Sequence, residues 1–426
     1  MENNQIVNRL KTYLYRGGFS YKNYTQKLKY IRKLNQKNQD EKAKFKKKYS
    51  NFSLKIQLAS FSTNKNITNF WSKLNYEDRE DLSHIHRWTW AIYLLTGKDS
   101  KINKTKKINF IKNVINNWCY KYGNYKIDYK NIIFEPYNIS ERLANYSLLV
   151  KLGYLNKDKE VLKILKKQLI FLTENLEFYY KKKSNHVLNN ARGILLFSHI
   201  INNKQYIKFA LKIVDFVLPK FIDKNGFFKF CSSHYQLIFS RWIIDINFFS
   251  EKKYINNVCK KVLSACEFFD LKNTNKNFNI PFFGNISPDF KPFWILNFIN
   301  REKKLKDFVY QYWKHYNNNK QFKLDKCKGS NEWIKKVRNN LTIFSRNPKI
   351  YGFDFNHSHN DFFHFVLYFK KNPVIIDLGK PNYSQESHNT YSSGKLHNSI
   401  IINKHATFDD YLPNKIKTKL GLKNIN

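Results

Sequence analysis

The stretch FDFNHSHNDFFHFVLYFKKNPVIIDLG, residues 353–379, decides the fold class of the C-terminal part of the chain. Residues 362–368 form an aromatic and β-branched run, 370–373 interrupt it with a turn containing Pro373, and 374–376 resume the apolar pattern. A third apolar run covers 399–402. The pattern therefore predicts a strand, a turn and a second strand, followed by a third strand.

The same stretch carries candidate metal ligands. In an extended strand alternate residues point to one face, so His357, His359 and Asp361 are expected side by side, with Asp377 near them after the turn. His397 precedes the third apolar run. Histidines with one carboxylate suit zinc or another borderline divalent ion. No HExxH or paired CxxC supports a metal, so the spacing equally allows a row of hydrogen-bonded surface histidines.

The chain before this region reads as all-α. Apolar residues recur at helical spacing, with Gly, Asn, Asp and Pro in the loops between helices. No fixed-period repeat is visible, which disfavours a regular array such as TPR, and about ten helices with short loops favour a helical toroid or solenoid. The expected helices are residues 84–95, 108–120, 140–152, 159–180, 185–201, 205–217, 234–248, 254–269 and 292–316.

These patterns predict an α+β multidomain protein. Residues 1–50 are rich in Lys, Asn and Tyr and are expected to form a basic helical arm. Residues 51–330 form the helical domain, and residues 331–426 form a strand-rich domain after a polar boundary near residue 330.

Composition narrows the class of partner. The 426 residues are 42% hydrophobic and 17% aromatic, which suits both a large core and a cleft whose rings stack on sugars. The formal charge of +44 favours a polyanionic partner. The lysines are scattered without a zinc-finger, RRM or basic-zipper pattern, and abundant Asn and Ile indicate a nucleotide bias of the genome, so specific nucleic-acid binding is disfavoured.

Cysteines and apolar runs bear on the compartment. The five cysteines are odd in number and widely spaced, which indicates neither a disulfide framework nor a CxxC site. The N-terminus has no apolar core typical of a signal peptide, and no run long enough for a membrane span occurs. The default expectation is a cytoplasmic protein, or a periplasmic or secreted one if the N-terminus is incomplete.

Two helical segments carry further candidate residues. Ser184 is a good N-cap, which would place Asn185 and His186 in a first turn whose free N–H groups favour an anion. The alternative is that both residues only cap the helix. Tyr235 lies near the start of another helix, where a lowered pKa would make it an acid or base, and the alternative is a core tyrosine.

Several motifs in order resemble the heparinase II/III-like polysaccharide lyases. The segments 357–361, 377–379 and 397–399 resemble that family's HxHxD, DPG and HNT motifs. Earlier segments follow in the family's order, so the resemblance spans residues 80–405: His86-Arg87, 134–142, Asn185-His186, 226–235 and 283–290.

The resemblance implies an (α/α) toroid followed by an antiparallel β-sandwich, and β-elimination at a uronic acid of an acidic polysaccharide. The C5 proton is poorly acidic, so the neighbouring carboxylate must be neutralised while charge develops on it. A base then removes the proton and an acid protonates the departing O4 oxygen.

By resemblance, each matched residue takes a role. Asn185 and His357 hold the carboxylate, Tyr235 is the acid and for some epimers also the base, and His186 is the other base. The matched substrate-binding residues are His86, Arg87, Glu141 and Arg142. A structural divalent metal, expected to be zinc, is held by His359, Asp377 and His397.

The sequence departs from the family pattern at three positions. Leu378 replaces the proline of DPG, Ser399 replaces the threonine of HNT, and Gln236 follows the matched tyrosine where histidine is frequent. The chain ends 29 residues after His397, which predicts a partial sandwich with an open edge. The alternative function is a catalytically silent carbohydrate-binding or processing protein of a surface-polysaccharide pathway. A glycoside hydrolase is disfavoured because no convincing carboxylate pair is visible.

Overall fold

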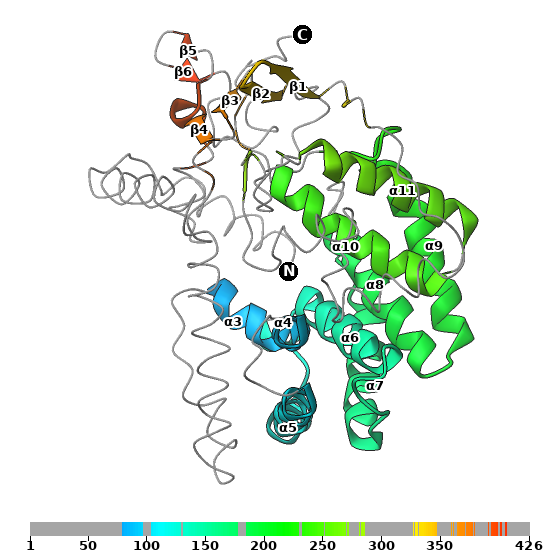
Figure 1. Cartoon of the computed structure of the whole chain (residues 1–426). Coiled ribbons are helices and arrows are strands. Elements are labelled where there is room, and N and C mark those ends of the chain that lie inside the picture. The colour runs from blue at the N-terminus through cyan, green and yellow to red at the C-terminus, as the bar shows by residue number, and fades with distance from the viewer. Residues whose placement is uncertain are drawn as a thin grey trace.

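The computed structural model describes most of residues 79–285 and, with gaps, parts of 327–406 (Figure 1). The expected arm over 1–50, the expected helix over 292–316, Ser184 and His357 lie outside the described residues. The described ranges are 79–96, 104–128, 131–177, 185–229, 232–250, 252–269, 271, 281, 283–285, 327, 329–330, 332–346, 359, 361, 364–370, 372–377, 379, 391, 393–398, 401–402 and 405–406.

The described N-terminal part is helical, as the sequence predicts. Asp158 and Asn203 cap α7 and α9 through their side chains, and Pro136 occupies the first turn of α6. The helices are α3 (Arg79–His86), α4 (Thr89–Thr96), α5 (Lys104–Tyr122), α6 (Pro136–Lys151), α7 (Lys159–Glu174), α8 (Asn185–Ile200), α9 (Lys204–Phe221), α10 (Ser233–Ser250) and α11 (Lys253–Phe268), with short 3-10 turns at Ile132–Phe134 and Gly394–Leu396.

The single helix expected over residues 84–95 is wrong, because the chain breaks between α3 and α4. Trp88 has a φ of 60°, in the left-handed region that interrupts a helix. Its side chain is fully buried and packs edge-on against Trp118, with ring centroids 5.3 Å apart. Burial of this large ring offsets the cost of the unusual backbone conformation.

Helices α6 and α8 run parallel and pack closely. Tyr137 contacts His186, and further along both helices Glu141 accepts a hydrogen bond from Arg192. A Cβ added at Gly193 would lie 2.7 Å from the backbone of Ser140, so only glycine allows this approach without movement.

Helix α10 runs in the same direction as α8. The ring of Tyr137 contacts both His186 and Trp242, and further along the two helices Arg192 contacts Asp245. Helices α7, α9 and α11 return beside their predecessors through short connections, so α6–α11 form three helical hairpins. The closure of such hairpins into a ring stays a prediction.

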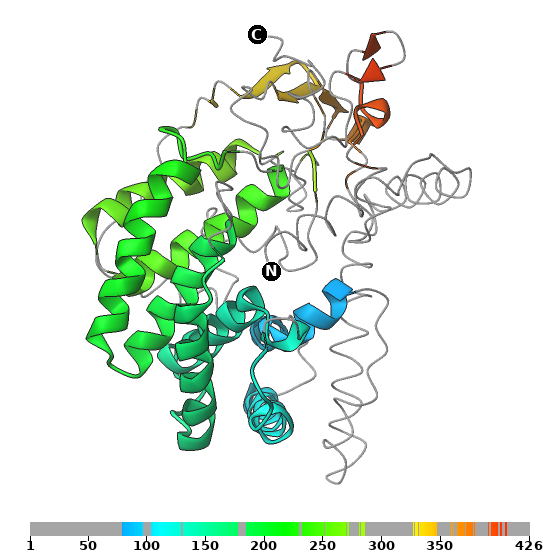
Figure 2. The same ribbon diagram turned by 180° about the vertical axis from the view of Figure 1, so that it is seen from behind.

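The strand-rich part contains a small antiparallel sheet of order β1-β2-β3-β4. Its strands are β1 (Trp333–Arg338), β2 (Leu341–Arg346), β3 (Phe365–Phe369) and β4 (Asn372–Ile375), and a separate two-stranded pair joins β5 (Ile401–Ile402) to β6 (His405–Ala406). Figures 1 and 2 show the sheet at one end of the helical domain, near the start of α10.

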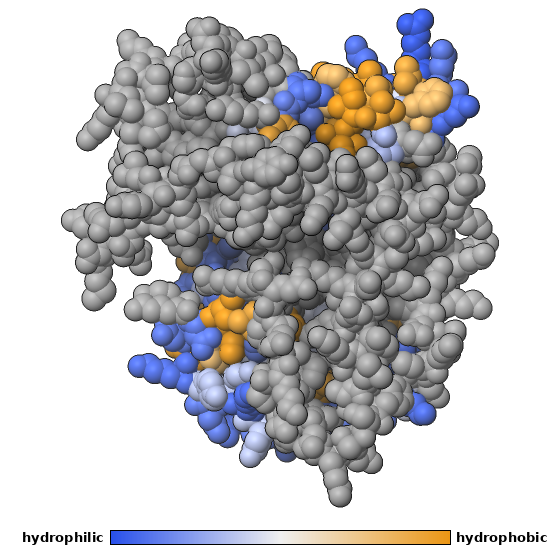
Figure 3. Space-filling view, turned by 90° about the vertical axis from the view of Figure 1, so that its left-hand side faces the viewer, coloured by the Kyte–Doolittle hydropathy of each residue, from blue (hydrophilic) through white to orange (hydrophobic). Residues whose placement is uncertain are grey.

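Aromatic side chains join the sheet to the helices. One face of the sheet buries Trp333 and Phe344, which contact Phe269 and Phe268 at the end of α11 with ring centroids 4.8 and 6.0 Å apart. The opposite face exposes apolar side chains, and such side chains gather at this end of the molecule (Figure 3). They include Ile334, Leu341, Ile343 and Phe369.

Among the described residues, no helix is long and apolar enough to cross a membrane.

Candidate active site and metal cluster

His186 begins the candidate site on the helical domain. It lies in the first turn of α8, and its Nδ1 is 2.8 Å from Oε1 of Glu177. The Glu177 side chain is 3% exposed, whereas that of His186 is 36% exposed. One edge of the imidazole is therefore fixed by a buried carboxylate while part of the ring remains open to solvent.

This pair shifts the charge states of both groups. Burial opposes the charged form of His186, but attraction and hydrogen bonding to Glu177 outweigh it and raise the pKa of the imidazole. Burial also opposes the charged form of Glu177, yet His186 and Asn190 lower the pKa of that carboxyl. Both shifts favour an imidazolium paired with a carboxylate.

The orientation of Glu177 is fixed by Asn190 on α8. The Glu177 backbone N–H donates to Asn190 Oδ1 at 2.9 Å, and Asn190 Nδ2 donates to Glu177 Oε2 at 2.9 Å. The same Nδ2 donates to Ser140 Oγ at 2.9 Å on α6. The carboxylate thus has one oxygen held by Asn190 and the other held for His186.

The ring of His186 also contacts an aromatic ring, which is tilted by 55° to it. The centroid of the His186 ring is 4.7 Å from that of Tyr137, and the guanidinium of Arg87 lies 4.5 Å from the centre of the Tyr137 ring. Arg87 Nε donates to Asn138 Oδ1 at 2.6 Å, which holds the guanidinium in place. The Tyr137 ring therefore contacts both the Arg87 guanidinium and the His186 ring at the start of α6 and α8.

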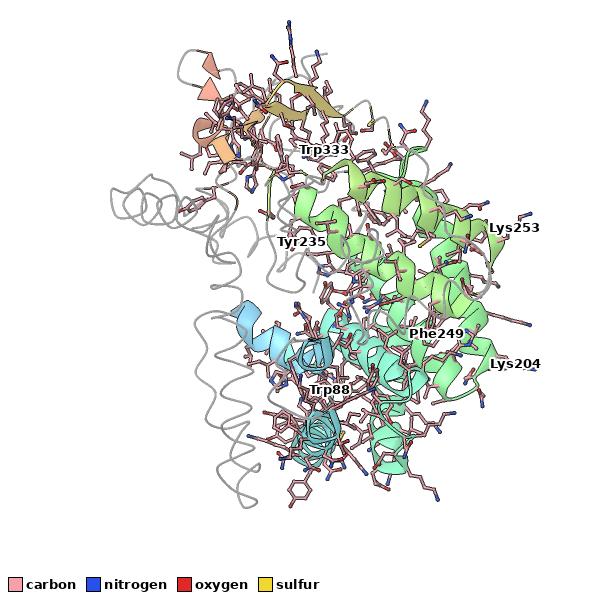
Figure 4. All side chains as sticks on the ribbon, viewed as in Figure 1. Trp88, Lys204, Tyr235, Phe249, Lys253 and Trp333 are labelled. Atoms are coloured by element: carbon pink, nitrogen blue, oxygen red, sulfur yellow. The ribbon has the colours of Figure 1, made fainter. Side chains whose placement is uncertain are left out.

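Tyr235 lies near the start of α10, and Asn185 is the first residue of α8, so both belong to the same end of these parallel helices as His186. The Tyr235 N–H donates to Ser232 Oγ at 3.0 Å, a side-chain cap of the helix. Figure 4 places Tyr235 at the end of α10 nearest the sheet, below Trp333.

A continuous row of rings connects Tyr235 with His186. Tyr235 contacts Phe239, Phe239 contacts Trp242, and Trp242 contacts Tyr137, with centroids 5.4, 4.8 and 6.0 Å apart. The Tyr137 ring in turn contacts His186. The two predicted proton-transfer residues therefore border one aromatic layer, which fixes their helices relative to each other.

Gln236, which follows Tyr235, holds the turn before that residue. Its Oε1 accepts from the Phe228 N–H at 2.8 Å and its Nε2 donates to the Gly226 carbonyl at 3.1 Å. Gly226 has a φ of 93°, and a Cβ there would lie 2.2 Å from the Lys261 carbonyl oxygen. The glutamine thus secures a turn that only glycine can make.

Between the sheet and the helices, His359, Asp377 and His397 form a buried cluster. One ligand atom of each residue lies within 4.8 Å of the others. Nδ1 of His359 is 3.1 Å from Nε2 of His397, and these nitrogens are 3.8 and 3.5 Å from the Asp377 carboxylate. The sequence predicted these three residues as metal ligands, and the structure brings them together.

The outward nitrogens of both histidines have oxygen partners. Nε2 of His359 is 2.9 Å from Asn285 Oδ1, and Nδ1 of His397 is 2.8 Å from the Ser393 carbonyl. Because these oxygens accept hydrogen bonds, each neutral imidazole would turn its lone pair toward the other. Two lone pairs beside a carboxylate fit a cation, and outer oxygens that orient histidines accompany metal sites generally.

Without a metal ion, a proton bound between these groups would supply the positive charge. Burial opposes the charged form of His397, but Asp377 outweighs it and raises the pKa of His397 to about 9. Burial would likewise raise the pKa of Asp377, but His397, His359 and His364 hold it well below its usual range. The Asp377 carboxylate therefore favours a positive charge on the neighbouring imidazoles.

His364 is a neighbour of this cluster that sequence reasoning missed. Its Nε2 is 3.7 Å from Asp377 Oδ2, and its Nδ1 accepts from the Asn398 N–H at 3.2 Å. A neutral His364 therefore carries its proton on Nε2 and presents an N–H, not a lone pair, to Asp377. In a continuous strand it would point away from His359, so the expected alternation concealed it.

The predicted polar row on a strand is wrong. His359 and Asp361 lie on irregular backbone before β3. Asp361 Oδ2 lies 3.9 Å from a guanidinium nitrogen of Arg346, and burial raises the pKa of the Asp361 carboxyl. Loops, not a regular strand, gather the ligands.

The four residues predicted to bind substrate lie in the helical domain with internal partners. Arg142 is fully buried and donates to Gln168 and to the carbonyls of His86 and Ile133. Glu141 is 3% exposed and accepts from Arg192 and Trp242. His86 is 1% exposed, and Arg87 is 4% exposed beside Tyr137.

A short segment joins the two groups of residues. Ser233 Oγ donates to the Pro281 carbonyl and accepts from the Phe283 N–H at 3.0 Å. The next residue, Gly284, donates its N–H to Asp377 Oδ2 at 3.1 Å, and Asn285 contacts His359. The segment containing Pro281 and residues 283–285 therefore links the first turn of α10 to the cluster of His359, Asp377 and His397.

The comparisons with known proteins concern the fold. No family model matches the sequence, and no curated protein matches it. A solved structure of heparinase III is similar at 15% identity, covering 78% of this chain and 57% of that chain, with a TM-score of 0.54. The heparan sulfate lyase HepC from Pedobacter heparinus is 14% identical, with 80% and 56% coverage and a TM-score of 0.47.

This chain thus spans less than two thirds of the length of either neighbour. The likeness to heparinase III shows a shared fold, in which a mainly helical domain is combined with an antiparallel β domain.

Proposed function

We propose that the chain is a polysaccharide lyase that cleaves a uronic-acid-containing acidic polysaccharide by β-elimination. The observation that carries this proposal is that a carboxylate-paired His186 and Tyr235 contact one row of aromatic rings at the common end of α8 and α10, where Asn185 begins α8. The fold shared with heparinase III and the charge of +44 support it.

The reaction needs a base, an acid and a means of stabilising negative charge. A neutral His186 with its proton on Nδ1 has a lone pair on Nε2 that removes the C5 proton. The C5–H electrons form the C4–C5 double bond, and the C4–O4 bond breaks. Tyr235 protonates the departing O4 oxygen, so the net change is one new double bond and one new chain end.

The uronate carboxylate must accept charge as the C5 proton leaves. We assign the amide of Asn185, at the start of α8, to donate to that carboxylate, and the positive end of the helix would add to the effect. On the sequence resemblance we assign His357 to the same task. Arg142, fully buried among internal partners, is left out of this scheme.

We further propose that His359, Asp377 and His397 hold a divalent ion, with zinc matching the two nitrogens and one carboxylate. When bound, the ion would supply positive charge that locks the three ligands together. Through Gly284 and Asn285 these ligands hold the segment that caps α10, so the role assigned to the site is structural.

The test is the ultraviolet absorbance of the unsaturated uronate produced from a panel of acidic polysaccharides by metal-replete protein. Tyr235→Phe should lower kcat by on the order of 10²-fold or more, because the acid is lost while the ring contacts remain. Tyr120→Phe is the matched control, since Tyr120 is 84% exposed on α5 and should keep full activity.

Retained turnover in Tyr235→Phe would remove this residue from the mechanism. Polysaccharide binding without any unsaturated product, by the unsubstituted protein across the whole panel, would favour the alternative of a catalytically silent carbohydrate-binding protein.

A further inference from the structure

We propose that Glu177 is a positioning residue that fixes the tautomer and ring orientation of His186, so that Nε2 is the nitrogen presented to the substrate. The inference rests on the proposed function for its catalytic meaning. Its structural content, a fixed tautomer, can be measured without turnover.

The Glu177 side chain has a single available orientation. Its side chain is 3% exposed, and its two oxygens have different partners, with Oε1 at His186 Nδ1 and Oε2 at Asn190 Nδ2. The Glu177 N–H donates to Asn190 Oδ1, which determines the way the Asn190 amide faces. The Asn190 amine must therefore point at Oε2, leaving Oε1 for the imidazole.

An acceptor at Oε1 selects one neutral tautomer of His186. A carboxylate oxygen cannot donate, so Nδ1 must carry the proton for the 2.8 Å contact to be a hydrogen bond. The lone pair of the neutral ring is then on Nε2. A carboxylate that orients a catalytic histidine in this way is a general feature of acid–base catalysis.

Three other groups also act on His186. The ring of Tyr137 contacts the imidazole, with centroids 4.7 Å apart. Glu135 adds negative charge and Arg87 adds positive charge, and both act more weakly than Glu177. Glu177 also favours the imidazolium, so the base form of His186 should become abundant only at a pH above the ordinary titration of histidine.

The variant Glu177→Gln sharpens the test, because the arrangement of Asn190 determines how the new amide will sit. Asn190 Nδ2 needs an acceptor, so the glutamine oxygen should take the place of Oε2 and its amine should face His186 Nδ1. Nδ1 must then accept, and the proton moves to Nε2. The substitution should invert the tautomer as well as remove the negative charge.

The experiment is a nitrogen-15 NMR titration of histidine-labelled protein, with His186 identified by the signals lost in His186→Gln. The unsubstituted protein should show the Nδ1–H tautomer at high pH and a His186 pKa above 6.5. Glu177→Gln should show the Nε2–H tautomer and a lower pKa, because the negative charge that favours the imidazolium is removed. Glu174→Gln is the matched control, since Glu174 is an exposed residue at the end of α7 and should change neither.

An Nε2–H tautomer in the unsubstituted protein, or a pKa at or below 6.5, would overturn the proposal even if Glu177→Gln does not fold. Where a uronate substrate is cleaved, the acidic limb of kcat/KM should follow the His186 titration, and Glu177→Gln should lower kcat/KM at every pH because its neutral imidazole carries the proton on Nε2. A confirmed Nδ1–H tautomer in a protein that cleaves nothing would refute the lyase function and leave the role of Glu177 as positioning residue intact.

Discussion

The imidazole of His86 shows how burial fixes the charge state of a single side chain. Its Nδ1 accepts from Trp118 Nε1 at 2.9 Å, and Trp118 and Tyr122 surround the ring. Burial, followed by the positive charges of Arg142 and Lys121, lowers the pKa of His86 to about 3. The folded protein therefore keeps this ring neutral in mild acid, whereas the unfolded chain protonates it.

This difference predicts the direction of a pH effect. Above pH 6.5 neither state protonates His86, and as the pH falls from 6.5 toward 3 only the unfolded state gains the proton, so stability is lost. The slope is about 1.4 kcal/mol per pH unit, or about 2 kcal/mol between pH 6.5 and 5.

His86→Gln should lose about 2 kcal/mol less than the unsubstituted protein over that interval, because glutamine can accept from Trp118 but does not titrate. Urea unfolding at several pH values measures both curves. Parallel curves for the two proteins would contradict the assignment of a buried neutral imidazole.

Individual site residues differ in how far the sequence could predict them. Asn185, His186 and Tyr235 stand at helix starts that periodicity and turn residues indicate. Glu177 was missed because it was expected within a helix over 159–180, whereas α7 ends at Glu174. Its role comes from Asn190, a partner 13 residues away that no local pattern reveals.

At the scale of elements, the spacing of α6 and α8 depends on one glycine. Gly193 faces the Ser140 backbone, and the Tyr137–His186 contact lies further toward the start of the same two helices. Helix propensity alone would make alanine better by roughly 1 kcal/mol. The added Cβ would, however, lie 2.7 Å from rigid backbone, so the helices would have to separate and the net effect on stability becomes unfavourable.

Gly193→Ala should therefore lower the free energy of unfolding by about 1–3 kcal/mol, measured by urea denaturation. Gly153→Ala offers a comparison, because nothing lies within 4 Å of its added Cβ and only its φ of 73° opposes the change. If Gly193→Ala stabilises the protein, the close approach of α6 and α8 is wrong.

Other elements show where sequence patterns fail. The first residues of α8 and α10 lie within one residue of the predicted starts. The left-handed backbone at Trp88 between α3 and α4 left no sign in the sequence, because neither glycine nor proline occurs at residues 86–89. The irregular backbone at His359 also escaped prediction, since alternation describes strands and not loops.

At the scale of the whole molecule, helices followed by a sheet could be predicted from the change of periodicity near residue 330, and β1 begins at Trp333. The docking of that sheet could not. It depends on aromatic contacts between residues such as Phe269 and Trp333, which are 64 positions apart in the sequence. Such pairings are specified by complementary shape and not by local propensity.

The proposed metal site of His359, Asp377 and His397 joins the helical and strand-rich parts, so ion binding should affect the stability of the whole molecule. The chelator-treated protein should bind one zinc ion and gain thermal stability on its addition, with about 2.7 kcal/mol expected at a hundredfold excess over Kd. His397→Ala should lose both effects because a ligand is removed. Metal content and melting temperature measure them.

His364→Gln is the matched control for that experiment. Glutamine keeps an N–H donor near Asp377, and the neutral tautomer of His364 excludes its nitrogen as a ligand. This variant should retain one zinc ion. Loss of zinc from His364→Gln with retention in His397→Ala would reverse the ligand assignment.

The segment containing Pro281 and residues 283–285 touches Ser233 at one end and the ligands Asp377 and His359 at the other. Ordering of this segment by an ion would therefore order the first turn of α10, next to Tyr235. Thermodynamic reciprocity then requires that a polysaccharide which orders the same turn tightens the ion by an equal factor. A chelator would therefore remove the ion more slowly from the polysaccharide-bound protein than from the free protein.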